Sequence, residues 1–266
     1  MLLLSKPPFQ TQERRPASAQ DSASIQVSLN RRTMVRALAG ITLLLLVASV
    51  AGQLVKYVLG NDVALGFVRL FYLDAEANIP TLFSTILLLF ASLLLGLIAV
   101  FKKTCQDTYR RHWVILSFIL LYMAIDEASE VHEMLNRLGW WVTGQKRAGG
   151  IFHYGWVMFG MAMAAVVALS YLTFFLHLPT QTKIQFITAA GTFLSGALGV
   201  EILEGLYSAS HSGESSFQYS MLVTVEEGLE MAGVIMLINA LLAYIHTCQI
   251  EVRVRFAEPE ENQQHP

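Results

Sequence analysis

Carboxylate side chains recur at one spacing in three apolar regions of the chain. Each region carries two glutamates three residues apart, namely Glu130 and Glu133, Glu201 and Glu204, and Glu227 and Glu230. Residues at positions i and i+3 of a helix share a face, so each pair would present two carboxylates together. The runs DEASE at 126–130 and EEGLE at 226–230 match further, because both place an acidic pair three and four residues before a glutamate. Converging carboxylates of this kind bind cations or share protons.

The depth of these acids follows from the length of the stretch before Asp126. Only thirteen uncharged residues, 113–125, separate Asp126 from the basic run at 110–112. A helix needs about 20 residues to cross the hydrocarbon core of a bilayer. If this segment spans the membrane, Asp126, Glu127 and Glu130 therefore enter it. Ionisable groups at that depth are costly and usually belong to an ion path or a functional site.

The composition indicates an integral membrane protein. The 266 residues are 54% hydrophobic and only 14% charged, with a mean hydropathy of +0.50, which lies outside the range of soluble globular proteins. The net charge of -2 and the lack of a basic aromatic patch exclude nucleic acid as a partner. Cys105 and Cys248 both fall at helix ends expected to face the cytosol, so we expect reduced thiols and no disulfide.

Long apolar segments predict an all-α membrane bundle of about six transmembrane helices. The segments lie at 37–59, 80–101, 113–136, 151–177, 184–207 and 221–250. Residues 1–36 and 251–266 are polar and are expected to be disordered tails that flank a transmembrane domain at 37–250. The acidic runs end the third helix and begin the sixth, which suggests a 3+3 inverted repeat around a shared central site.

Lys and Arg residues near the segment ends predict the orientation. Ten lie on the side that holds both termini and five on the other side, so the termini are expected in the cytosol and the protein in the plasma membrane. The loop at 60–80 then lies outside, and its run VALGFVRLFYL is expected to form a short helix in the interface.

With this topology, the acids of three helices gather in the outer half of the membrane. The predicted site consists of Asp126, Glu127, Glu130, His132, Glu133, His153, Glu201, Glu204, Glu226, Glu227 and Glu230, with Asp74 and Glu76 at its outer mouth. The transmembrane segments supply no Lys or Arg at this depth, so protons, a metal ion or a transported cation must balance the charge. Carboxylates with an occasional imidazole suit Fe, Mn, Zn, Mg or Ca.

Simpler readings compete with this site. Residues 231–250 alone are long enough to span, so Glu226 to Glu230 could form a solvated extension of the sixth helix. His153, beside Tyr154 and Trp156, could belong to an interfacial aromatic belt. On one continuous helix, His132 would point away from Asp126 and Glu130. The familiar enzyme signatures are absent, and the carboxylates lack the ExxH spacing of ferritin-like di-iron bundles.

Three runs resemble an uncharacterised family of multi-pass bacterial membrane proteins. They are FYLDAEANIPTLFS at 71–84, DEASEVHE at 126–133 and EEGLEMAG at 226–233. The resemblance implies a family signature made of Asp74, Glu76, Asn78, Pro80, Asp126, Glu127, His132, Glu133, Glu226, Glu227 and Glu230, but it supplies no activity. The ExxE motif is also similar to that of ferric-iron permeases, where an Arg precedes it. Here the preceding residues are Ser129, Val200 and Glu226, which weakens that analogy.

These observations predict a membrane protein with a carboxylate-rich cation site, most simply a transporter or channel for a divalent metal ion or protons. A second hypothesis is a membrane-embedded metal-dependent enzyme acting on a lipid-like substrate. A third is a structural or assembly subunit whose acids bind a basic partner. The expected partners are the lipid bilayer and a cation, and the sequence leaves a homo-oligomer open.

Overall fold

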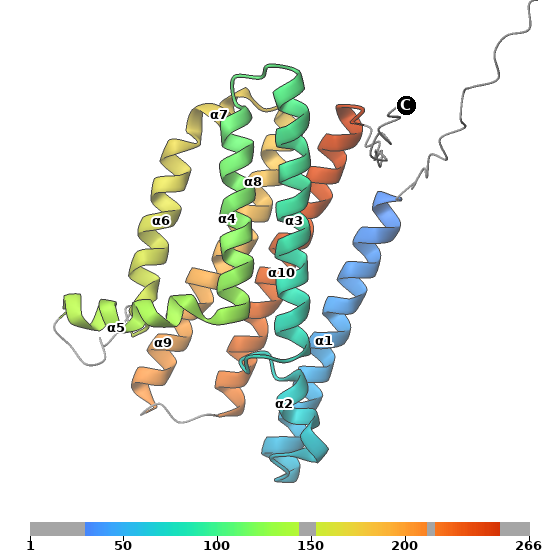
Figure 1. The fold of residues 1–266 in the computed structure, drawn as a ribbon. Coiled ribbons are helices and arrows are strands. Elements are labelled where there is room, and N and C mark those ends of the chain that lie inside the picture. The colour runs from blue at the N-terminus through green and yellow to red at the C-terminus, as the bar shows by residue number, and fades with distance from the viewer. Residues whose placement is uncertain (1–29, 144–152, 212–215, 251–266) are drawn as a thin grey trace, which may run out of the picture. The chain divides into compact units, whose positions relative to one another are not determined.

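A computed structural model describes residues 30–143, 153–211 and 216–250, and this part of the chain is helical without a strand (Figure 1). Its helices are α1 (Arg31–Leu59), α2 (Phe67–Phe71), α3 (Ile79–Thr104), α4 (Arg110–Ser129), α5 (Val131–Thr143), α6 (Trp156–Ser170), α7 (Leu172–His177), α8 (Thr180–Leu194), α9 (Glu201–Ser210) and α10 (Phe217–Thr247). A 3₁₀ turn, η1 (Ala64–Gly66), precedes α2, and a π-helical segment, η3 (Ser195–Val200), joins α8 to α9. Both predicted tails lie largely outside the described residues.

The expected membrane helix bundle is confirmed. Within the described residues, five helical segments are long and apolar enough to cross a membrane, namely α1, α3, α4, α10 and the continuous run from α8 to α9. The predicted fourth span corresponds to the shorter apolar helix α6, which α7 follows. Figure 1 shows α1, α3, α4, α6, α8 and α10 running roughly along one direction. The inverted repeat stays a prediction.

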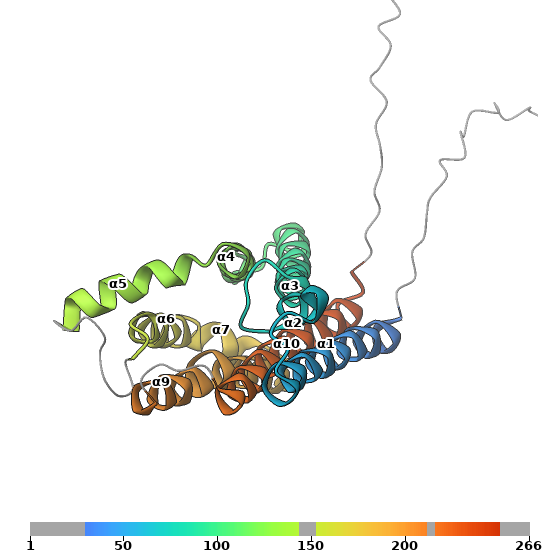
Figure 2. The same cartoon turned by 90° about the horizontal axis from the view of Figure 1, so that it is seen from below.

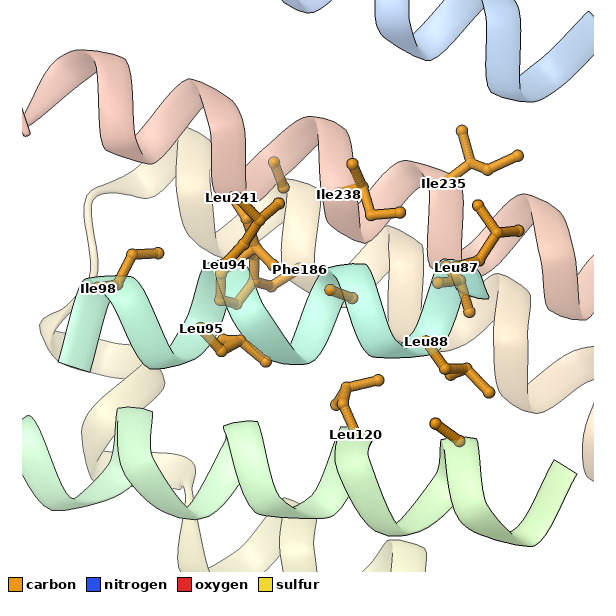
Figure 3. Packing of buried hydrophobic residues seen from close by; sticks show 14 of the residues in the cluster. Leu87, Leu88, Leu94, Leu95, Ile98, Leu120, Phe186, Ile235, Ile238 and Leu241 are labelled. Carbon is orange, nitrogen blue, oxygen red and sulfur yellow. The ribbon is translucent and has the colours of Figure 1, made fainter. Parts of the chain in front are cut away.

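Helix α10 lies at the centre of the packing. It contacts α8, α1, η3 and α3, and most of its length is apolar. Figure 3 shows leucine and isoleucine side chains of α3 filling the space between α10 and α4. Gly233 permits the close approach of α10 to α8, because a Cβ there would lie 2.6 Å from the backbone nitrogen of Phe193. Small residues at such crossings let transmembrane helices pack tightly.

A reciprocal serine contact joins α3 to α4. Ser92 Oγ donates to the carbonyl oxygen of Ser117 (2.8 Å), and Ser117 Oγ donates to the carbonyl oxygen of Ser92 (2.9 Å). Gly96 leaves room for this pair, since a Cβ there would lie 3.3 Å from Ser117 Oγ. Hydroxyl bonds of this kind stabilise helix contacts in an apolar surrounding.

The predicted third span does not continue to residue 136. Helix α4 ends at Ser129, and Glu130 adopts a left-handed conformation with a φ of 53°. Its backbone N–H donates to the carbonyl oxygen of Asp126 at 2.7 Å, which closes the last turn. The chain then turns into α5, which runs across the end of the bundle (Figures 1 and 2). Asp126 and Glu127 therefore end α4, and His132 and Glu133 belong to another helix.

The loop before α3 contains the short helix expected in VALGFVRLFYL. It comprises η1 and α2, and Val68 of α2 is buried against Gly52 of α1. Asn78 then caps α3, because its Oδ1 accepts the backbone N–H of Thr81 at 3.1 Å. Its Nδ2 donates to the carbonyl oxygen of Tyr72 at 2.6 Å, so one amide fixes both the loop and the start of the helix.

Candidate functional site

The acids meet at one end of the bundle, which we call the acid-bearing end. It is formed by the last turn of α4, by η3 and α9, by the first half of α10 and by the loop between α2 and α3. These elements hold Glu127, Glu201, Glu204, Glu226, Glu227, Glu230 and Asp74. The opposite end carries Lys102, Lys103, Arg110, Arg111 and Lys183.

Three glutamates from α9 and α10 form one group, the acid triad. The side chain of Glu226 lies within interaction distance of both Glu201 and Glu204. Glu204 is 3% exposed and Glu226 is 8% exposed. Within the described residues, Glu204 Oε1 has no hydrogen-bond partner. The prediction that Glu226 could lie in a solvated helix extension is therefore wrong for this residue.

Aromatic donors surround the acid triad. Trp156 Nε1 donates to Glu201 Oε1 at 3.2 Å, and the Tyr219 hydroxyl lies near Glu204. The hydroxyl groups of Tyr219 and Tyr154 lie 3.0 Å apart. The pKa of Tyr154 is raised to about 12, mainly by burial; the hydrogen bond with Tyr219 lowers it, and nearby carboxylates contribute to the rise. Tyr154 thus stays a neutral hydroxyl that can donate or accept.

A second group of acids, the α4–α10 acids, lies beside the triad. Glu127 of α4 is an electrostatic neighbour of both Glu227 and Glu230 of α10, and it lies near Ser84 of α3. Glu127, Glu230 and Ser84 also line a cavity of about 10 Å³, which is close to the space that one water molecule needs. Apolar side chains such as Leu87, Phe193 and Met231 form the rest of its wall.

The predicted outer mouth lies near both groups. Asp74 is an electrostatic neighbour of Glu201, Glu204 and Glu227, and it hydrogen-bonds to Tyr72. Glu76 is a neighbour of Glu227. Asn78 holds this loop against the start of α3, so the loop acids and the helix acids occupy one region.

Local backbone geometry brings α9 and α10 close enough for the triad to form. The π-helical segment η3 immediately precedes Glu201 and changes the face that the following residues present. Gly196 within it packs directly on α10, where an added Cβ would lie 2.7 Å from the carbonyl oxygen of Glu226 and 3.1 Å from Glu230 Cγ. Only a glycine fits this crossing without moving α10.

Asp126 and His132 form a pair that sequence reasoning placed apart. His132 Nδ1 lies 3.0 Å from Asp126 Oδ2, and the His132 backbone N–H donates to Asp126 Oδ1 at 2.7 Å. The prediction that His132 points away from Asp126 is wrong because Glu130 breaks the helix between them. The same break removes the expected i, i+4 pairing of Asp126 with Glu130.

The remaining predicted residues have separate placements. Glu130 caps α4, and the side chain of Glu133 lies outside the described part of the structure. His153 packs edge-on against Tyr154 and lies next to Gly205, one residue after Glu204. A role of His153 in the acid site and a role in an interfacial aromatic belt therefore both stay predictions.

Neither a metal cage nor a basic partner is formed around these acids within the described residues. No group of three or more His, Cys, Asp or Glu side chains is arranged to hold a metal ion there. No Lys or Arg of the described chain forms an ion pair with the triad or with the α4–α10 acids. The triad is instead a group of neighbouring carboxyl groups in which Glu226 interacts with both Glu201 and Glu204.

Sequence reasoning missed the neutral groups that complete the site. Carboxylates of the site have neutral neighbours in Ser84, Trp156 and Tyr219. Tyr72 connects the loop acid Asp74 with α10, because its hydroxyl lies 3.2 Å from Ser220 Oγ. One signal was available, because Tyr219 precedes Glu226 by seven residues, which is two helical turns on one face.

Comparison with known proteins places the chain without assigning an activity. No curated protein and no solved structure matches it. A family described as a domain of unknown function (DUF8692) matches residues 37–245, which begin within α1 and end within α10. The chain belongs to this family of unknown function, which agrees with the expectation of an uncharacterised family, while the bacterial and multi-pass character of the family stays a prediction.

Proposed function

We propose that this protein is an integral membrane protein that binds protons in the acid triad and moves them as part of a coupled transport cycle. The observation that carries the proposal is the close approach of the Glu226 side chain to both Glu201 and Glu204, with Glu204 and Glu226 buried. An ionised carboxylate only accepts hydrogen bonds, so two carboxyl groups bond to each other only when one holds a proton.

The surroundings support protons as the balancing charge. Two ionised carboxylates at hydrogen-bonding distance repel each other, and burial in a low dielectric strengthens the repulsion. No Lys or Arg of the described residues offsets it. Buried intramembrane acids of this kind commonly form proton relays in pumps and transporters. The unpartnered Oε1 of the buried Glu204 gives the triad one further acceptor for an incoming proton or cation.

The position of the site supports transport. The triad and Asp74 lie at the acid-bearing end, and Leu87, Leu88 and Met231 fill the bundle beyond the α4–α10 acids. A binding site next to one surface and closed by packed side chains toward the other is what one state of an alternating-access cycle requires. Glu127 and Glu230, at the edge of the apolar packing, would be the next proton acceptors.

A divalent metal ion stays the alternative cargo or cofactor of the same acids. In that case the triad would have to rearrange so that several oxygens point at one ion. Metal analysis of the purified protein distinguishes the two cases. Stoichiometric iron, manganese, zinc, magnesium or calcium that is lost in Glu226→Gln would replace the proton proposal with the metal-site hypothesis.

The decisive variant is Glu226→Gln. A hydrophobic carbodiimide, which reacts with protonated carboxyl groups, is expected to label Glu226 in the wild type at neutral pH and to lose this reaction as the pH rises. Because the folded wild type holds a proton that the unfolded chain releases, its stability should fall with rising pH by about 1.4 kcal/mol per pH unit for each such proton. Glutamine donates its own N–H bonds, so Glu226→Gln should flatten this slope. Thermal unfolding in detergent as a function of pH measures it.

Glu130→Gln is the matched control, because Glu130 lies outside the triad and should keep the wild-type slope. Proton flux into liposomes containing a pH-sensitive dye then tests movement of the proton, and Glu226→Gln is expected to abolish it. Equal pH slopes in the wild type and Glu226→Gln, together with an unlabelled Glu226, would refute the proposal.

A further inference from the structure

The buried face of α1 carries polar groups that the protein leaves without partners. Ser49 and Gln53 are 0% exposed. Ser49 Oγ, Gln53 Oε1, Gln53 Nε2 and the Tyr57 hydroxyl are buried and have no hydrogen-bond partner within the described residues. The three residues are spaced four apart, so they form one line along the helix, which we call the α1 polar stripe.

The stripe is enclosed by α10 and α2. Helices α1 and α10 run antiparallel, with Leu46 against Gly228 and, further along α1, the Tyr57 ring 6.2 Å from the Phe217 ring. Gly52, next to Gln53, packs on Val68 of α2. Because the stripe lies between these helices, lipid headgroups and bulk solvent do not satisfy its polar groups.

Another buried hydroxyl on the same helix behaves differently. Thr42 is 6% exposed, and its Oγ1 donates to the carbonyl oxygen of Leu38 at 3.1 Å. Ser49 has the same option within its own helix and does not use it. A buried amide with neither its acceptor nor its donor paired is rare in proteins and normally indicates an ordered water.

Water is the ligand that matches the hydrogen-bond donors and acceptors of the stripe. A hydroxyl group donates one hydrogen bond and accepts others, and an amide side chain does both. A cation would satisfy only the acceptors, and an anion only the donors. Water is neutral, small and able to satisfy both, so it fits every group of the stripe.

The stripe continues toward the acids through a second tyrosine. Tyr57 is an electrostatic neighbour of Tyr72, and Tyr72 hydrogen-bonds to Asp74. Asp74 in turn neighbours Glu201, Glu204 and Glu227. Burial and the charge of Asp74 raise the pKa of Tyr72 above its ordinary value, which keeps its hydroxyl neutral and able to both donate and accept.

We propose that the α1 polar stripe binds a file of water molecules that delivers protons through Tyr72 and Asp74 to the acid triad. Each step transfers one proton to a water oxygen while another proton leaves that same water, so no group changes its net charge after a complete passage. The proposal rests on the proposed proton-binding function and assigns its supply route to α1.

The test is Gln53→Leu, which replaces the amide by an apolar side chain of similar volume and removes the anchor of the file. The measurement is the rate of hydrogen–deuterium exchange of the Glu226 carboxyl, followed by infrared spectroscopy after mixing with D₂O. We expect this rate to fall by about tenfold, which is the effect of losing one hydrogen bond from the path. The final extent of exchange should not change. Thr42→Val is the matched control, since it removes a hydroxyl of the same face that bonds within its own helix.

The stability of the same variants tests the waters independently of the acids. If the stripe holds water, Gln53→Leu and Ser49→Ala lose water-mediated hydrogen bonds, so neither raises the unfolding temperature. If the stripe is dry, removing an unpaired polar group raises that temperature and leaves the exchange rate unchanged, which overturns the inference. A wild type without a protonated Glu226 would refute the proposed function, while the unfolding temperatures would still decide whether the stripe binds water.

Discussion

The two ends of the bundle treat buried carboxylates in opposite ways. At the opposite end, Asp107 Oδ2 accepts a hydrogen bond from Lys102 Nζ at 2.8 Å, and Asp107 Oδ1 accepts the backbone N–H of Tyr109 at 2.8 Å. At the acid-bearing end, Glu226 meets two other glutamates and no described Lys or Arg. One end pairs its acid with a base, and the other end assembles acids with one another.

The contrast separates a structural charge from a functional one. A carboxylate that receives an ammonium group and a backbone N–H is satisfied as an anion and gains nothing from a proton. A carboxylate between two others is satisfied only when protons are shared. The two ends should therefore make the stability of the protein depend on pH in opposite directions. One substitution at either end should remove the pH dependence that this end contributes.

The largest expected effect is that of Lys102→Met. The side chains of Lys102 and Asp107 are both 16% exposed, so the variant leaves a mostly buried aspartate without its base, which should destabilise the fold by about 3 kcal/mol at neutral pH. Burial opposes the charge of Asp107, but the hydrogen bonds from Lys102 and Tyr109 outweigh it and hold the pKa of that carboxyl below its usual value. The wild type should therefore lose this stabilisation as the pH falls below about 4, through the lowered pKa.

Thermal unfolding of Lys102→Met between acidic and neutral pH measures both effects. The variant should be less stable than the wild type at neutral pH, and the two should converge at acidic pH. Lys103→Met is the control, because Lys103 is exposed and its loss should change the stability by less than about 0.5 kcal/mol. A constant difference between Lys102→Met and the wild type at every pH would mean that packing of the lysine stem, and not its charge, stabilises this end.

The next largest effect concerns the helix contact that builds the triad. Gly196→Ala puts a Cβ 2.7 Å from the carbonyl oxygen of Glu226, so α10 must move away from η3, at a cost of about 2 kcal/mol. The movement should separate Glu226 from Glu201 and Glu204, and carbodiimide labelling of Glu226 should change along with the stability. Mass spectrometry measures the extent of Glu226 labelling, and the unfolding temperature measures the stability of the fold.

Gly191→Ala is the matched control for this contact. Gly191 belongs to α8 in the same continuous helical run, and an added Cβ meets no atom within 4 Å. Alanine favours helix over glycine by about 1 kcal/mol, so this variant should be neutral or slightly more stable. Unchanged labelling in Gly196→Ala would show that the triad does not depend on the close approach of η3.

Much of the acid-bearing end was predictable from the sequence because its signal is local. The ExxE pairs of 201–204 and 227–230 lie at helical spacing, and the apolar lengths of α3 and α10 fix which end carries acids. The Asp74 loop was predictable as a neighbour of these acids, since the topology returns it to the same side. The orientation in the membrane stays a prediction.

The unpredicted features depend on contacts between distant segments or on single backbone angles. The triad needs the π-helical segment η3, whose extra residue leaves no composition signal in SGALGV. The α1 polar stripe was hidden because Ser49 and Gln53 sit in a span that reads as apolar overall. The end of α4 was missed because DEASEVHE has no glycine or proline to mark the left-handed conformation of Glu130.

The smallest expected effect tests which of the two classes Asp126 joins. It lies at the acid-bearing end, yet its Oδ1 accepts the His132 backbone N–H at 2.7 Å and its Oδ2 lies 3.0 Å from His132 Nδ1, so it is paired like Asp107. Its carboxylate supplies the first turn of α5 with an acceptor, which makes it a capping residue for that helix. Asp126→Ala should therefore destabilise the protein by about 1 kcal/mol, whereas Asp126→Asn keeps an acceptor oxygen and should lose less than half of that. Thermal unfolding of both variants gives the difference.

Carbodiimide labelling of Glu226 should be the same in both variants, because the cap does not hold the triad together. If Asp126→Asn is as destabilising as Asp126→Ala and shifts the labelling of Glu226, the charge of Asp126 belongs to the convergent acids, and the division between paired and proton-sharing carboxylates must then be drawn within the acid-bearing end itself.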